Sequence, residues 1–510
     1  MENHALSITN KWFREQGILW LVMGLLSAVL TLLLSYSTSP LYVHDGCDSC
    51  VFQTMGMLLL QGKVPYVDLF DHKGPMLYFI QALGLWLGGG KIGIFILQIL
   101  VNTISLTFIY KTIRLFVDAV PAVIVFAGTM VLYSYFHGEG NFVEGWMLGC
   151  IAPALYLALR NILSQPDERQ LLWSSAFYGF CLAMCFMIRP NDAVIHIGGL
   201  MFGVFVWMLS KRWYKQAWQN ALVMALVFVA CVVPVLAFYA WHDALDDLWY
   251  ALIVYNTQYA KGDASLFSSA LLLPKLIVFI PLLAIAVCIG VRKEPAILLV
   301  LAVQIVLAWL FLGERMYRHY WTSMVPLLTL FGIAGVYWKK VTAGIAAVVV
   351  VGIIALAIFK TDVLTSSMNY AKAMAHYYVE KQQVAEKLYD EAEAIFANVP
   401  IEEQDRIWNY NLGWVEKPYF SVFYHHGIIQ CNRVPLYEMV LVDEQLRRAD
   451  DVKRERPLWI MLTRDKNMCW RLDEWQIQDE EFIQANYTCV ASTNPQICMI
   501  ELWKRNNEQK

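Results

Sequence analysis

Long runs of apolar residues, separated by short polar segments, occupy the first two thirds of the chain. A helix needs about 20 such residues to cross the hydrocarbon core of a bilayer. The runs predict a polytopic α-helical membrane protein with eleven crossings, near residues 16–38, 92–113, 117–136, 142–160, 170–188, 192–210, 217–241, 271–291, 295–312, 319–338 and 341–360. No small-residue cleavage pattern follows the first run, so we interpret it as an uncleaved anchor.

The apolar segment 74–88 decides the sidedness of the chain. Its fifteen residues are short for a crossing and suit an interfacial or re-entrant helix. If it does not cross, the basic clusters of the short loops all lie on one face, as expected of the cytoplasmic side. These clusters are Lys11 and Arg14, Lys111 and Arg114, Arg160 and Arg169, Lys211, Arg212 and Lys215, Arg292 and Lys293, and Lys339 and Lys340. We therefore predict a cytoplasmic N-terminus and an extracytoplasmic C-terminal region.

This sidedness brings five polar segments to the outer face of the membrane. They are residues 39–91, 137–141, 189–192, 242–270 and 313–319, and they contain the unusual combinations of His, acidic residues and Arg. Functional side chains are commonly found on loops that a rigid scaffold holds in place. We expect the chemistry of the protein at these outer loops.

The distribution of charge divides the chain into two parts. Residues 363–510 contain 40 of the 81 Asp, Glu, Lys and Arg residues, and residues 1–362 contain the other 41. With 58% hydrophobic and 16% charged residues, the chain is not an ordinary soluble protein. A net charge of −3 without a strongly basic stretch gives no support to nucleic-acid binding. We predict a transmembrane domain over 1–362 and an extracytoplasmic domain over 363–510.

The C-terminal region has the pattern of a small α/β domain. A stretch rich in Ala, Glu and Lys at 367–397 predicts a helix, and further helical patterns lie at 435–449 and 472–484. Short runs typical of β-strands lie at 406–411, 457–463, 487–492 and 497–503. Cys489 and Cys498 could pair across the last predicted hairpin in an oxidising compartment.

The first outer loop contains two acidic groups separated by about twenty-five residues. Asp45 and Asp48 follow the first crossing, and a later group comprises Asp68, Asp71, His72 and Lys73. Between them, 49–61 has the pattern of a short surface helix, with GKVPY as a turn. This arrangement would fold the two groups back toward each other, although a solvated loop without a function explains the charges equally well.

Other polar and ionisable residues lie at the outer ends of predicted crossings. Arg suits phosphate because of its forked donors, but Arg and Lys at such positions often only reach toward lipid headgroups. The residues concerned are Glu139, Asn141, Glu144, Arg189, Arg315, Tyr317, Arg318 and His319. We find no His, Asp and Cys set with convincing metal-ligand spacing and no nucleotide-binding motif.

Several short motifs resemble the integral-membrane glycosyltransferases of the GT-C fold, including protein O-mannosyltransferases and the lipid A aminoarabinose transferase. A short acidic motif after the first crossing is followed by GKVPYVDLFDHKGPMLYF, in which DHKGP is fairly specific. GEGNFVEGW (138–146), IRPND (188–192) and RMYRHYWTSMVPLL (315–328) are similar to further family segments and occur in the same order. The resemblance covers the whole membrane part and implies a GT-C-like fold with an outer soluble domain.

The resemblance implies transfer of a sugar from a polyprenyl-phosphate carrier to an acceptor on the outer face of the membrane, usually with inversion. An attacking hydroxyl calls for a carboxylate base, and the acidic motif matches Asp48, with Asp45 as the alternative. The Lys before Pro in this loop contacts carrier phosphate in the aminoarabinose transferase pattern, and Lys73 matches it. Arg189, Arg315 and His319 are further candidates for carrier phosphate. Candidates for binding donor or acceptor are Asp71, His72, Glu139, Asn141, Glu144 and Tyr317.

The expected partners are therefore the polyprenyl-phosphate sugar, membrane lipids and a glycan, lipid or protein acceptor. The sequence identifies no certain cofactor, and a divalent cation held by Glu144 is possible. The resemblance places the protein in the inner membrane of a bacterium. A polysaccharide polymerase or ligase that uses a lipid-linked oligosaccharide remains an alternative. A transporter is disfavoured, because it would carry charges near the bilayer midplane, where the predicted crossings have almost none.

Overall fold

The structure is a computed structural model, which describes residues 2–42, 46–137, 139–261, 269–311, 318–337, 387, 389–412, 418–431, 433, 451–465, 474–493 and 498–506. The chain forms two compact units. The first unit comprises Met1–Ser35, Ile94–Ala237 and Asp263–Tyr370. The second unit comprises Tyr36–Gly93, Phe238–Gly262 and Ala371–Lys510. The first outer loop therefore belongs to the same unit as the C-terminal region.

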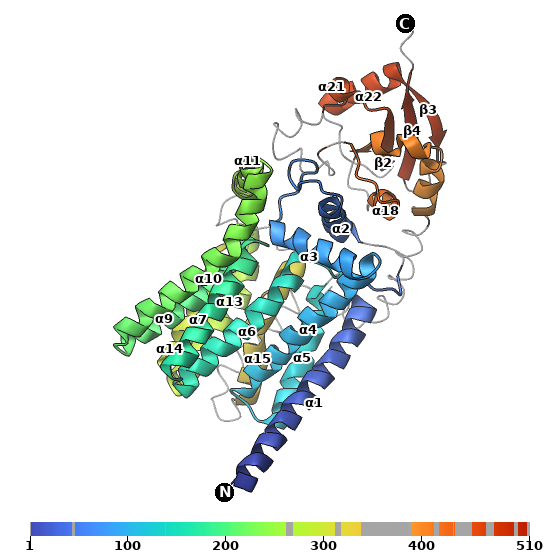
Figure 1. Ribbon diagram of the computed structural model, residues 1–510. Helices are drawn as coiled ribbons and strands as arrows, with labels where there is room; N and C mark the ends of the chain where they lie inside the picture. Colours follow the sequence, from blue (N-terminus) through green and yellow to red (C-terminus); the bar gives the residue numbers. More distant parts are fainter. Residues whose placement is uncertain are drawn as a thin grey trace. The chain divides into compact units, whose positions relative to one another are not determined.

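Helices make up the first unit (Figure 1). In chain order they are α1 (Glu2–Leu34), α4 (Lys91–Arg114), α5 (Ala119–His137), α6 (Val143–Ser164), α7 (Glu168–Phe186), α8 (Pro190–Asp192), the π-helix η1 (Ala193–Gly198), α9 (Gly199–Ser210), α10 (Tyr214–Trp241), α13 (Ser269–Arg292), α14 (Pro295–Phe311), the 3-10 helix η3 (Arg318–Thr322) and α15 (Val325–Tyr337). Both α4 and α10 also extend into the second unit.

Six helical segments among the described residues are long and apolar enough to cross a membrane. They are Glu15–Leu34, Lys91–Arg114, Ala119–His137, Val143–Ser164, Pro190–Ser210 and Tyr214–Trp241, and each coincides with a predicted crossing. The predicted crossings at 170–188, 271–291, 295–312 and 319–338 overlap α7, α13, α14 and α15. The last predicted crossing, 341–360, and the domain boundary at 362 lie outside the described residues.

Close helix packing in the first unit depends on small residues. A Cβ atom added at Gly203 of α9 would lie 2.8 Å from the Val300 Cα of α14, closer than real Cβ contacts allow. Helices inside a membrane gain no hydrophobic driving force from burial against each other, so close approach at small residues supplies much of their packing energy. The glycine therefore allows α9 and α14 to pack at this point.

Short helices of the second unit come from two outer loops. The first loop forms α2 (Cys47–Leu60) and α3 (Pro75–Leu87), close to the predicted helices at 49–61 and 74–88. The second forms α11 (Leu245–Trp249), the π-helix η2 (Tyr250–Tyr255) and α12 (Asn256–Lys261). Because α3 has 13 residues, it is about 20 Å long, shorter than the hydrocarbon core. That length suits an interfacial or re-entrant helix, and the predicted sidedness stays a prediction.

A four-stranded sheet forms the centre of the C-terminal part (orange and red in Figure 1). The strands are β1 (Ile407–Leu412), β2 (Trp459–Asp465), β3 (Tyr487–Ser492) and β4 (Cys498–Arg505), in the order β1-β2-β4-β3. β1 pairs with β2 in parallel, whereas β4 is antiparallel to both β2 and β3. All four strands overlap predicted ones, and α22 (Glu474–Asn486) overlaps the predicted helix at 472–484.

Both faces of this sheet are covered, as the alternation along β1 and β2 requires. On one face Ile407, Trp459 and Met461 pack with residues of the helical stretch 389–396 and of α18 (Pro418–His425). On the other face Trp408 and Ile460 pack with residues of α22 and of α21 (Val452–Glu455). The predicted helix at 435–449 lies outside the described residues.

The suggested disulfide between Cys489 and Cys498 is not formed. Cys489 is a free thiol. In the hairpin it stands opposite Trp503, whereas Cys498 begins β4 opposite Asp465 of β2. The strand register therefore separates the two cysteines.

Contacts within the second unit join the C-terminal part to the first outer loop. The helix α18 packs on α2, and Gln61 Nε2, just after α2, donates to the carbonyl of Gly427 at 2.8 Å. In the loop itself α2 packs tightly on α3, because Gly56 faces the α3 backbone. A Cβ added at Gly56 would lie 2.7 Å from the Ala82 amide nitrogen.

We expect Gly56→Ala to lower the stability of the protein by about 1–3 kcal/mol, because the α3 backbone would have to move. The measurement is thermal unfolding of the purified protein in one detergent. Gly128→Ala in α5 is the matched control, since its Cβ would meet nothing within 4 Å. An unchanged melting temperature for Gly56→Ala would contradict this account of the α2–α3 contact.

Candidate active site

A tight turn in the first outer loop precedes Asp71, His72 and Lys73. Pro65 and Leu69 form an isolated β-bridge, and the Tyr66 amide donates to the Leu69 carbonyl at 2.8 Å. Asp68 Oδ2 accepts from the Val64 amide at 2.6 Å and stabilises the turn. Tyr66 has a φ of 72°, an uncommon backbone conformation for a bulky residue. Surrounding contacts must therefore hold this residue in place.

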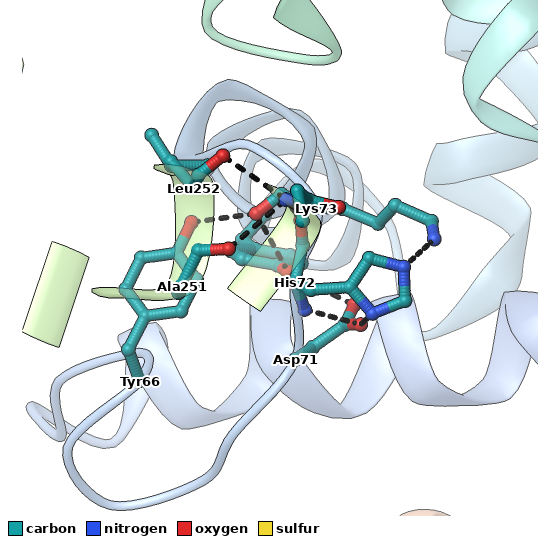
Figure 2. A network of polar contacts seen from close by, with 8 residues as sticks. Tyr66, Asp71, His72, Lys73, Ala251 and Leu252 are labelled. Atoms are coloured by element: carbon teal, nitrogen blue, oxygen red, sulfur yellow. Dashed lines mark hydrogen bonds and ion pairs between the residues drawn. The ribbon is translucent and has the colours of Figure 1, made fainter. Parts of the chain in front are cut away.

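Asp71, His72 and Lys73 form a line of interacting side chains directly after this turn (Figure 2). Lys73 Nζ lies 2.5 Å from His72 Nε2. A lysine ammonium can only donate, so His72 Nε2 accepts and the neutral ring carries its proton on Nδ1. His72 Nδ1 in turn faces Asp71 Oδ1 at 3.7 Å. The imidazole thus lies between the ammonium and the carboxylate.

Two tyrosines from the second outer loop hold the His72 ring. It stacks on Tyr255, at the end of η2, with a centroid distance of 5.2 Å, and on Tyr259 of α12 at 5.3 Å. Asn256 Nδ2 donates to the His72 carbonyl at 2.9 Å. Tyr66 donates its hydroxyl to the Lys73 carbonyl at 2.7 Å, and the Tyr78 hydroxyl oxygen lies 3.1 Å from the same carbonyl. Side chain and backbone of this short segment are thereby fixed together.

Asp71 is the buried carboxylate of this group, with only 2% of its surface exposed. Its Oδ1 accepts from the His72 amide at 2.7 Å, and its Oδ2 accepts from the Tyr78 hydroxyl at 2.9 Å. Burial raises the pKa of the Asp71 carboxyl above its usual value, and the nearby charge of Asp48 adds to this. The Lys73 ammonium and the two hydrogen bonds act in the opposite direction. Asp71 therefore needs these partners to remain ionised.

Asp48 lies in the first turn of α2 and is partly exposed. A carboxylate at this position is stabilised by the unsatisfied backbone amides at the helix N-terminus. The charge of Asp48 contributes to the raised pKa of Asp71, so Asp48 lies within electrostatic range of the second acidic group. The alternative residue, Asp45, lies outside the described residues.

A second charged cluster lies in the first unit. Arg189, just before α8, donates to Glu144 Oε1 of α6 and also lies 3.3 Å from Asp192 Oδ2. The ring of Tyr320 in η3 lies 4.1 Å from the Arg189 Cζ atom, a cation–π contact. Glu144 is 1% exposed, so its charge depends on this pairing. The cluster joins three helix ends.

Further predicted residues surround this second cluster. His319 stacks on Phe142 at 4.2 Å, and Asn141 Oδ1 accepts from the Trp146 indole nitrogen at 2.9 Å. His137 is hydrogen-bonded to Ser35 Oγ at 2.6 Å, and Glu139 is partly exposed. Arg315 and Tyr317 lie outside the described residues, and so does the Arg318 side chain.

Several residues of both clusters escaped the sequence analysis. Asp192 follows Arg189 by three positions, a helical spacing that could have indicated the ion pair. Tyr255 and Tyr259 have the i, i+4 spacing of one helix face, but nothing local identifies His72 as their partner. No sequence pattern marked Arg433, whose contacts are described below. Within the described residues, no group of three or more His, Cys, Asp or Glu side chains is arranged to hold a metal ion.

Residues 72–238 match the profile of the family described as dolichyl-phosphate-mannose-protein mannosyltransferase. This segment begins at His72 and contains Lys73, Glu144 and Arg189. No curated protein matches the sequence.

Solved structures give the fold. The crystal structure of ArnT from Cupriavidus metallidurans bound to undecaprenyl phosphate is similar with a TM-score of 0.59 and 13% identity, over 95% of this chain and 98% of that one. The Archaeoglobus fulgidus oligosaccharyltransferase in complex with zinc and sulfate matches 86% of this chain and 67% of its own. Its TM-score is 0.47 at 13% identity. The chain therefore shares its fold with ArnT, and its segment 72–238 is similar to the dolichyl-phosphate-mannose-protein mannosyltransferase family.

Proposed function

We propose that the protein transfers a sugar from a polyprenyl-phosphate carrier to an acceptor hydroxyl at the outer face of a bacterial inner membrane. The carrier is supported by the similar ArnT structure, which is bound to undecaprenyl phosphate. The acceptor is a glycan, lipid or protein. One observation carries the proposal: the partly exposed ammonium of Lys73 is held through His72 beside the buried Asp71, and the same loop carries the partly exposed carboxylate of Asp48 in the first turn of α2.

Asp48 is the general base in this proposal. The attacking hydroxyl must lose its proton to a carboxylate that the acceptor can reach. Asp71 is nearly inaccessible, and both of its oxygens already accept hydrogen bonds. Asp48 is partly exposed and lies in the first turn of α2, where an acceptor can reach its carboxylate. Asp71 is therefore the positioning carboxylate for His72 and Lys73.

Lys73 binds the carrier phosphate. Negative charge develops on this phosphate as the sugar leaves, and a fixed cation stabilises it. An ammonium has three donors, and its contact with His72 holds Lys73 in place without cancelling its charge. The neutral His72 ring and the ionised Asp71 thus keep the ammonium in a defined position.

The reaction is a single displacement. The acceptor oxygen forms a bond to the anomeric carbon of the sugar while the bond from that carbon to the phosphate oxygen breaks. The acceptor proton moves to Asp48, and the bonding electrons leave with the polyprenyl phosphate. Attack opposite the leaving group inverts the configuration of the sugar. The same steps serve a lipid-linked oligosaccharide as donor.

The second cluster organises helix ends within the first unit. Arg189 interacts with two carboxylates, so we assign it to holding the outer ends of α6, α8 and η3 together. His319 and Asn141 lie beside these helix ends, where their polar groups suit sugar hydroxyls. Mass spectrometry of envelope glycans and lipids from a deletion strain tests the overall function. A strain that lacks the protein should lose one sugar from one acceptor, and an unchanged profile would contradict the proposal.

Asp48→Asn should lower the rate of sugar transfer by about 10²–10⁴-fold, because the amide cannot take the acceptor proton. Binding of the carrier lipid should remain, since the substitution preserves the shape of the side chain. The assay uses purified protein and a polyprenyl-phosphate sugar. Asp68→Asn is the matched control in the same loop, because an amide oxygen can still accept from the Val64 amide. Full activity of Asp48→Asn would rule out the base assignment.

Lys73→Ala should weaken binding of polyprenyl phosphate by about 10–100-fold, the effect of losing one charge-assisted hydrogen bond. Titration of the purified protein with undecaprenyl phosphate measures this. Lys63→Ala removes an exposed lysine from the same loop and should leave the affinity unchanged. Equal affinity of Lys73→Ala and the unaltered protein would remove Lys73 from the site.

Tyr78→Phe should shift the acid limb of the rate–pH profile to higher pH. The lost hydroxyl stabilises ionised Asp71, so its removal raises the pKa of this carboxyl further. Protonated Asp71 no longer orients His72 and Lys73, and activity is lost at a higher pH. A hydrogen bond of about 1.4 kcal/mol corresponds to about one pH unit. Tyr410→Phe removes the same kind of bond, from Asp479 in the C-terminal region, and should leave the limb in place.

A further inference from the structure

One arginine of the C-terminal region binds the first outer loop through both its side chain and its backbone. Arg433 Nε and Nη2 donate to the Tyr66 carbonyl at 3.0 and 2.7 Å. The Arg433 carbonyl accepts from the Phe70 amide at 2.7 Å. Arg433 therefore holds both sides of the turn that precedes Asp71, and all of these residues belong to the second unit.

The same guanidinium also binds the second outer loop. Arg433 Nη2 lies 2.6 Å from Asp247 Oδ1 in α11. Both side chains are about one third exposed, so this ion pair alone contributes little to stability. The ion pair does, however, fix the position of α11. This helix continues into η2 and α12, which carry Tyr255, Asn256 and Tyr259.

Two chains of contacts lead from Arg433 to the proposed catalytic segment. In the first, Tyr66 is bound by Arg433 at its carbonyl and donates its hydroxyl to the Lys73 carbonyl. In the second, Asp247 fixes the start of the helical stretch whose tyrosines stack on His72. Tyr66 is fully buried with a positive φ, a conformation that persists only when its surroundings impose it. Two bonds to its carbonyl are part of that constraint.

We propose that Arg433 is a positioning residue: it fixes the two outer loops to each other and so sets the place of His72 and Lys73. This inference rests on the proposed function for its effect on the reaction, but not for its effect on the loops. Arg suits the role because its planar fork reaches a carbonyl and a carboxylate at once. A lysine has a single charged nitrogen and can satisfy one partner well, but not both in this geometry.

Hydrogen exchange measured by mass spectrometry tests the positioning directly. In Arg433→Ala, amides of residues 64–73 and 250–259 should exchange about tenfold faster, because the bonds that hold both segments are lost. Asp247→Asn keeps the bonds to Tyr66, so its increase should be confined to 250–259. Arg454→Ala is the matched control, since Arg454 is an exposed arginine of the C-terminal region whose side chain pairs with the neighbouring Glu455. Unchanged exchange in Arg433→Ala would overturn the proposal.

Kinetics test the consequence for catalysis. Arg433→Ala should lower kcat by about 10–100-fold, the usual effect of small misplacements in an active site. Arg433→Lys should restore part of this loss, and KM for the polyprenyl-phosphate sugar should change less than kcat. Lost activity without faster exchange would mean that Arg433 acts on the substrate itself. Normal activity with faster exchange would mean that the positioning is irrelevant to catalysis. Either result overturns the proposal.

If the unaltered protein transfers no sugar from this donor, the proposed function fails, while the exchange experiment still decides the role of Arg433.

Discussion

A buried carboxylate is stable only when its charge is balanced and its oxygens accept hydrogen bonds. Asp71 meets this requirement with the His72 amide, the Tyr78 hydroxyl and the Lys73 ammonium. Each of these groups is fixed in turn by another part of the second unit. The arrangement of the first outer loop therefore follows from keeping one carboxylate ionised away from water.

The second cluster meets the same requirement in a different way. Glu144 and Asp192 are both buried, and one guanidinium serves both of them. Because removal of either partner from a buried pair leaves an uncompensated charge, the ends of α6 and α8 are bound together strongly. The aromatic contact with Tyr320 adds η3 to the same group. Charges that are sparse in the sequence of this unit thus determine how its helix ends meet.

The sequence was most informative where the structural signal is local. Apolar runs predicted the long helices, and alternation with β-branched and aromatic residues predicted all four described strands. The segment DHK also marked Asp71, His72 and Lys73, because these reactive residues are consecutive. The short motifs marked Glu144 and Arg189 separately, but their pairing was not predicted.

Contacts between distant segments could not be predicted in this way. Arg433 and Tyr66 are 367 positions apart, and no pattern around a single arginine identifies its partner. The same holds for Tyr255 and His72, whose stacking depends on how α11 leads into η2. The disulfide considered possible between Cys489 and Cys498 is not formed, because a short sequence separation does not reveal the strand register, which places Trp503 opposite Cys489.

The π-helical turn η2 has a consequence for comparing this chain with its relatives. A π-helical turn holds one more residue than an α-helical turn, and each added residue rotates the following side chains by about 100°. The direction in which Asn256 and Tyr259 point therefore depends on a single residue within Tyr250–Tyr255. An alignment that treats 245–261 as one uninterrupted α-helix would shift these positions by one and pair His72 with the wrong side chains. In a distant relative, the equivalents of Tyr255 and Tyr259 should be sought by geometry, with a one-residue gap allowed inside the helix.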